Sequence, residues 1–222
     1  MNLYSDSALL ETCLRSLGSK EDVDRHRIVL EIKEHLEAAA CELSLERFAN
    51  FENELYQRLF AFVHDEHLKV KRGGILALRT LIDCTSAAAE SKVIKFANTI
   101  AAALKGNTDL SIIESVTDAL GYMASHSPVS HVDYVESELN RALEWLHSTQ
   151  PHRLFAACMI LKQLADNAPT IFFVRTREFF DMIWIPLWHT QEFLRLSAGQ
   201  ALSACLAVLS QRTYHLQWYV ID

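Results

Sequence analysis

Glycine and proline are scarce in this chain, with six and four copies among 222 residues. A β-sandwich or β-barrel needs many turns, and most tight turns depend on these two residues. The prolines at positions 128, 151 and 169 lie near expected helix boundaries, where helices tolerate proline best. Pro186 falls inside an aromatic run, where we expect it to kink or end a helix. The composition therefore favours an all-α fold.

Cysteine pairs and long apolar runs are also missing. The five cysteines, at positions 13, 41, 84, 158 and 205, are scattered, odd in number and without a CxxC motif. This pattern predicts reduced cysteines that act as small apolar residues in a reducing compartment. No stretch approaches 18 uninterrupted apolar residues, so we expect no transmembrane segment. The N-terminus, MNLYSDSALL, lacks the basic and apolar regions of a secretory signal.

Positive charge is in deficit, with 21 basic against 28 acidic residues and a formal net charge of −7. Proteins that bind nucleic acid in general need a basic footprint to displace counterions from the phosphates. We therefore expect no nucleic-acid partner.

What the chain does contain is a repeated helical stripe. The first clear copy is Gly73, Gly74, Ala77, Leu78 and Leu81, which share one helical face because they lie three or four residues apart. Three further copies are Ser115, Val116, Ala119, Leu120 and Met123; Ala156, Ala157, Ile160, Leu161 and Leu164; and Ser197, Ala198, Ala201, Leu202 and Cys205. The third position of each copy follows the previous one by 42, 41 and 41 residues. A weaker copy precedes them at Ile28, Val29, Ile32 and Leu36.

A period in the low forties built from two helices is typical of HEAT-type repeats. The stripe then belongs to the inner helix of each pair, which packs against both neighbours. We expect ten helices in five antiparallel pairs, forming one continuous α-solenoid of the armadillo/HEAT type over residues 1–222. The expected helices cover about 5–17, 22–43, 44–63, 69–81, 93–104, 110–124, 132–146, 156–164, 172–184 and 198–209. Because two glycines inside a helix are costly, Gly73 and Gly74 predict a close approach of another backbone.

Motifs for catalysis are few and weak. His64 and His67 flank two acidic residues, but the HExxH spacing of a zinc site is absent, and we expect a solvated turn. Lys71-Arg72-Gly73-Gly74 is superficially like a phosphate-binding loop, yet it lies within the helical stripe. No GxSxG, GxxxxGK[ST] or GxGxxG motif occurs. We predict no catalytic, cofactor-binding or metal-binding residue and no cofactor.

Two surface features leave alternatives open. The aromatic run 172–188 forms either repeat core, which we favour, or a cofactor pocket or partner groove. The basic residues near inner-helix starts either line one ridge that binds an acidic partner or, as we favour, pair with nearby acidic residues. These residues are Lys69, Lys71, Arg72, Arg153 and Arg195.

A family resemblance is carried by short motifs in a fixed order from about residue 60 to the end. They are Lys71-Arg72-Gly73-Gly74-Ile75-Leu76-Ala77, Phe96-Ala97-Asn98, Tyr134-Val135-Glu136, Arg141-Ala142-Leu143-Glu144-Trp145-Leu146, Pro169-Thr170, Phe172-Phe173, Phe179-Phe180-Asp181, Ala204-Cys205-Leu206, Gln211-Arg212 and Gln217-Trp218-Tyr219. Together they resemble the N-terminal HEAT region of target-of-rapamycin (TOR) serine/threonine kinases, which belong to the phosphatidylinositol-kinase-related group.

The resemblance implies a non-catalytic scaffold, the amino-terminal arm of a kinase that acts in nutrient and growth signalling. In that family this arm supports dimerisation, docks the substrate-recruiting subunit Raptor and forms part of the surface engaged by the small GTPase Rheb. Nothing in this chain matches the kinase domain, so no catalytic or ATP-binding residue is carried over. The implied location is the cytoplasm, with recruitment to a lysosomal or vacuolar surface and a nuclear pool as further options.

Two other functions fit parts of the pattern. An unrelated HEAT-repeat adaptor, of the transport-receptor or phosphatase-regulatory type, would show the same repeat spacing, but the order of the motifs disfavours it. A small helical enzyme would need a cluster of polar residues, which the sequence does not offer. We also expect the apolar end Trp218–Ile221 to be a seam where a further repeat would pack, so that the isolated chain self-associates.

Overall fold

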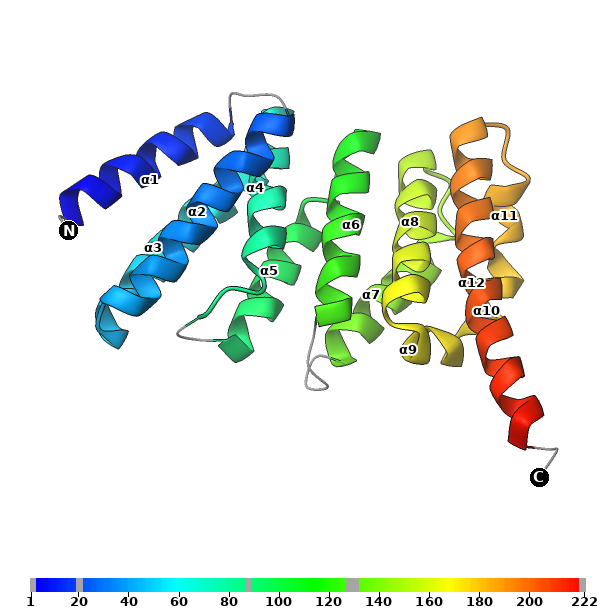
Figure 1. The fold of residues 1–222 in the computed structure, drawn as a ribbon. Helices are drawn as coiled ribbons and strands as arrows, with labels where there is room; N and C mark the ends of the chain where they lie inside the picture. The colour runs from blue at the N-terminus through cyan, green and yellow to red at the C-terminus, as the bar shows by residue number, and fades with distance from the viewer. Residues whose placement is uncertain (1–2, 19–21, 87–88, 127–131, 220–222) are drawn as a thin grey trace. The chain divides into compact units, whose positions relative to one another are not determined.

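The computed structural model describes residues 3–18, 22–86, 89–126 and 132–219. Within these ranges it contains twelve α-helices and no strand, which confirms the all-α solenoid (Figure 1). The chain divides into two compact units, Met1–Gly106 and Asn107–Asp222. The prediction of a single domain over residues 1–222 and the assignment of the repeats to the HEAT type stay predictions. The break expected at Pro128 lies outside the described residues.

The first unit holds five helices. They are α1 (Leu3–Leu17), α2 (Asp22–Glu42), α3 (Leu45–His64), α4 (Leu68–Leu81) and α5 (Ala89–Ala102). Helix α2 packs against both α1 and α4, and α3 packs along α4 after the short turn 65–67. Helix α5 joins this core through Phe96, whose ring meets Tyr56 of α3 edge-on at 4.8 Å. The stripe residues of α2 and α4 are buried.

The glycine pair of α4 is the point of closest packing in this unit. A Cβ atom on Gly73 would lie 2.8 Å from the Leu17 carbonyl oxygen at the end of α1. A Cβ atom on Gly74 would lie 2.8 Å from Cβ of Phe62 and 2.9 Å from the backbone nitrogen of Val63, both on α3. These distances leave no room for a side chain at either glycine, so the predicted close backbone approach is confirmed. The Lys71–Gly74 stretch is helical and its two glycines are buried, so it does not form a phosphate-binding loop.

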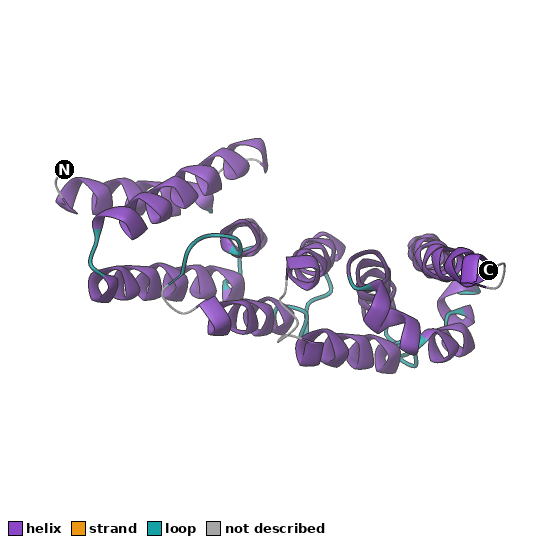
Figure 2. Ribbon diagram, turned by 60° about the horizontal axis from the view of Figure 1, so that its bottom comes forward, coloured by secondary structure: helices purple, strands orange, loops and turns teal. Residues whose placement is uncertain are grey.

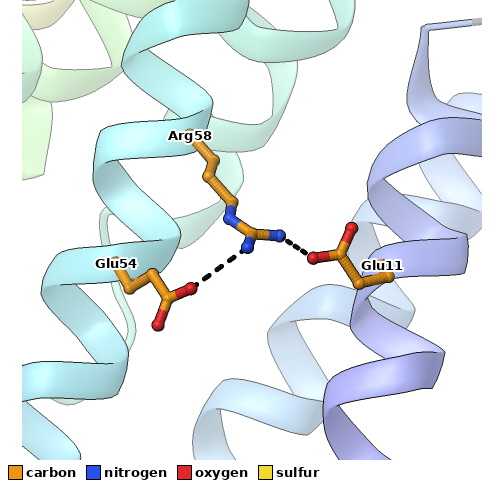
Figure 3. Close-up of polar contacts among 3 residues, drawn as sticks. All are labelled: Glu11, Glu54 and Arg58. Atoms are coloured by element: carbon orange, nitrogen blue, oxygen red, sulfur yellow. Dashed lines mark hydrogen bonds and ion pairs between the residues drawn. The ribbon is translucent and has the colours of Figure 1, made fainter.

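An ion-pair bridge also links α1 to α3. The Arg58 guanidinium lies between Glu11 of α1 and Glu54 of its own helix, with 3.1 Å between Nη2 of Arg58 and Oε1 of Glu54 (Figure 3). All three side chains are substantially exposed, so the bridge contributes little to stability. The apolar contacts of α1 carry most of its attachment.

The second unit repeats one arrangement along its length. Its helices are α6 (Leu110–His126), α7 (Val132–Trp145), α8 (Pro151–Asn167), α9 (Pro169–Val174), α10 (Thr176–Met182), α11 (Trp184–Leu187) and α12 (Glu192–Tyr219). Helix α8 lies between α6 and α12 in one layer, whereas α7 and the segments α9 to α11 pack on these helices from the other layer (Figure 2). The stripe is buried in all three inner helices, apart from the half-buried Ser115 and Leu202.

The expected single helix over 172–184 is instead three short segments, and this prediction was wrong. Pro186 lacks the N–H that would bond the Met182 carbonyl, and its ring would clash there, so a continuous helix cannot pass. The break falls at Ile183, between α10 and α11. The chain also breaks at Arg175, between α9 and α10, where the Thr176 hydroxyl donates to the Phe173 carbonyl at 2.9 Å.

Helix boundaries elsewhere differ modestly from the expected ones. Helix α8 begins at Pro151, as expected for a proline near a helix boundary, because proline fits the first helical position without losing a hydrogen bond. Helix α12 begins at Glu192 and continues to Tyr219. The start of α6 follows the expected turn chemistry, since Asp109 Oδ1 accepts the Ile112 backbone N–H at 3.1 Å.

Candidate functional site

The turn between α3 and α4 does not have the geometry of a metal site. The backbone N–H of His67 donates to Asp65 Oδ1 at 2.7 Å, and Nδ1 of the same ring lies 3.0 Å from that oxygen. The bond from the backbone, followed by the ring contact, lowers the pKa of Asp65. Among the residues that the structure describes, no three His, Cys, Asp or Glu side chains are placed to hold a metal ion. The predicted lack of catalytic, cofactor-binding and metal-binding residues stays a prediction.

The aromatic run 172–188 is part core and part surface. Phe172 and Phe179 are buried and meet with ring centroids 5.6 Å apart, as the core interpretation predicted. Trp184 and Trp188 do not fit that interpretation, because 51% and 83% of these residues are exposed. With the exposed Ile185 they form an apolar surface on α11, which we call the tryptophan patch.

The repeat explains where the tryptophan patch lies. Leu143 and Glu144 of α7, and His147 just after this helix, line the groove between α7 and α10, so they face the next outer helix. Positions 41 residues later are Trp184, Ile185 and Trp188. The patch therefore occupies the positions that correspond to the groove-lining side of α7, where Leu143 is buried and Glu144 and His147 are exposed. This spacing was visible in the sequence, and it is the signal by which the patch could have been found.

The groove between α7 and α10 is open and polar. Arg175 spans it: Nη1 donates to Asn140 Oδ1 at 2.6 Å, and Nε donates to Glu178 Oε1 at 2.6 Å. The guanidinium lowers the pKa of Glu178, and the hydrogen bonds to Glu178 raise the pKa of Arg175. Glu144 and Asp181 also line the groove. Apart from His147, Arg175 is the only described residue lining this groove that can carry a positive charge, and it is already bonded to Asn140 and Glu178.

The basic residues singled out in the sequence do not come together as one described group. In the second unit Arg153 and Arg195 occupy the first turns of α8 and α12. The Arg153 guanidinium lies 6.0 Å from the centre of the Trp145 ring, and Arg195 Nη1 donates to the Thr190 carbonyl at 2.7 Å. In the first unit Lys69 is exposed, and Lys71 and Arg72 are half-buried, all three at the start of α4. These contacts establish neither a shared basic ridge nor the pairing of all five basic residues with acidic side chains.

The buried charged residues in the described part of the chain include Glu138 of α7 and Lys92 of α5. Glu138 of α7 is buried and pairs with Arg141, whose guanidinium lies 5.1 Å from the centre of the Trp145 ring. Burial raises the pKa of Glu138, against the opposing effect of Arg141. Lys92 of α5 is also buried, and its Nζ donates to the Cys84 carbonyl at 2.5 Å and to the Leu81 carbonyl at 3.2 Å. Burial lowers the pKa of Lys92.

The cysteines and the longest helix bear on two further predictions. All five cysteines are unpaired, and four are buried, as expected for small apolar residues. The segment Glu192–Arg212 of α12 is long and apolar enough to cross a membrane by length and composition alone. Its stripe is packed against α8, and core helices of ordinary domains meet the same criteria, so it does not indicate a transmembrane segment. The backbone of Trp218 and Tyr219 continues α12, but their side chains and residues 220–222 lie outside the described part.

Comparison with known proteins finds relatives in a plant, a yeast and an insect. No family model matches the chain. It is 32% identical over 195 residues to the serine/threonine-protein kinase TOR of Oryza sativa subsp. japonica, which covers 86% of this chain. It is 32% identical over 188 residues to the serine/threonine-protein kinase tor1 of Schizosaccharomyces pombe, which covers 84%. The serine/threonine-protein kinase mTor of Drosophila melanogaster matches 98% of the chain at 27% identity.

Each match covers a small part of the relative. The chain spans 8% of the rice and fission yeast proteins and 9% of the fly protein. A solved engineered protein covers 86% of this chain, with 79% of its own length matched, at 16% identity and a TM-score of 0.47. That structural likeness is too weak to bear on function.

Proposed function

We propose a function from one premise: this chain belongs to the TOR serine/threonine-protein kinase family and corresponds to a segment about 8% as long as such a kinase. On this premise, we propose that the chain is the N-terminal HEAT arm of a TOR-type kinase and acts as a non-catalytic scaffold for protein partners. The whole protein would be an ATP-dependent serine/threonine kinase in nutrient and growth signalling.

The single observation that carries the proposal is the agreement of the relatives over one helical stack. Matches from a plant, a yeast and an insect each extend over 84–98% of the chain. Stacked helix pairs present extended surfaces on both layers, and repeat proteins use such surfaces to bind other proteins. The exposed tryptophan patch supports this role, because aromatic side chains are enriched at protein interfaces.

The proposed partners are those of the family arm. They are a Raptor-like subunit, a Rheb-like small GTPase and a second TOR chain. A cytoplasmic protein recruited to an endomembrane surface, with a nuclear pool as an option, would meet these partners. The chain itself would need no cofactor and would transfer no phosphate.

Direct binding with purified proteins tests the proposal. The chain is immobilised, and a Raptor-like subunit and a Rheb-like GTPase loaded with GTP or GDP are passed over it. We expect saturable binding of at least one of them and no phosphate transfer from ATP to a model substrate. The proposal fails if neither protein binds a chain whose circular dichroism shows it to be folded, or if the chain alone phosphorylates the substrate.

A further inference from the structure

We draw no further inference here: the strongest candidate, the open groove between α7 and α10 with the carboxylates of Glu144 and Asp181 on its two walls, is an acidic cluster in which Arg175 already bonds Asn140 and Glu178, and nothing in the described part of the structure shows which ligand would occupy it.

Discussion

At Gly74 the backbone of α4 comes so close to α3 that no side chain fits between the two helices. The nearest atoms are Cβ of Phe62 and the backbone nitrogen of Val63, neither of which can move without shifting α3. Gly199 on α12 is the opposite case, because space is open around it. The two positions form a matched pair that separates packing from the general effect of replacing a glycine in a helix.

We expect Gly74→Leu to lower the free energy of unfolding by about 1–3 kcal/mol, because it overpacks a closed contact. Gly199→Leu should leave it unchanged or raise it by up to about 1 kcal/mol, since glycine is a poor helix former. Urea unfolding at a concentration that keeps the chain monomeric gives both values. Equal stabilities for wild type and Gly74→Leu would show that the close approach carries no energetic weight.

For single residues, the sequence predicted which side chains are buried better than which are exposed. Two adjacent glycines inside a helical stripe are costly, and that cost made the close approach of α4 predictable. Trp184 and Trp188 were assigned to the core because large aromatic side chains are usually buried. Whether such a residue is covered depends on the next helix along the stack, and hydrophobicity at a single position carries no information about that neighbour.

In addition to the apolar contacts of Phe96, one buried cation links helix α5 to the end of α4. Nζ of Lys92 donates to the carbonyls of Leu81 and Cys84 at the C-terminal end of α4, where backbone carbonyls lack helical donors. The Leu81 carbonyl also accepts the Cys84 backbone N–H at 3.2 Å. A positive charge is favourable at this end of a helix. Burial opposes it and lowers the pKa of Lys92 below 10.5. The anchor thus combines two satisfied carbonyls with a partly desolvated charge.

We expect Lys92→Met to destabilise the first unit by about 1–3 kcal/mol, because it removes a donor from both the Leu81 and the Cys84 carbonyl. Lys95→Met, at an exposed position of the same helix, should have little effect. Hydrogen exchange should report faster exchange at the amides of α5 in the first variant only. Since the folded-state pKa of Lys92 is lowered, the wild type should also gain stability relative to Lys92→Met as pH rises from that pKa towards 10.5.

The break-up of the aromatic helix into α9, α10 and α11 shows what was and was not predictable for whole elements. Pro186 ends a helix for reasons contained in its own ring, so the break next to it was expected. No residue marks the break at Arg175 in the sequence: the hydroxyl bond of Thr176 to the Phe173 carbonyl is of the kind that Thr117 makes inside the unbroken helix α6. Periodic stripes predicted the long inner helices well, whereas the aromatic run carried a sequence signal for only one of its two breaks.

On the scale of the whole chain, each described helix of the second unit packs on helices of its own repeat or of the adjacent repeat. Such short-range packing is the property by which repeat proteins fold in sections. We expect a fragment of residues 107–222 to fold alone, with helical circular dichroism and a cooperative urea transition. A fragment that is disordered or melts without a transition would show that residues 1–106 are needed to hold it together.

The central claim is that this chain is the partner-binding arm of a TOR-type kinase, and a pull-down tests it most directly. The chain is used as bait in a cell lysate, and the eluate is identified by mass spectrometry against the Trp184→Ser/Trp188→Ser variant as a matched bait. Our account predicts recovery of Raptor-like or Rheb-like proteins with the wild-type bait. Recovery of transport cargo or phosphatase subunits in their place would contradict it and favour the unrelated HEAT adaptor.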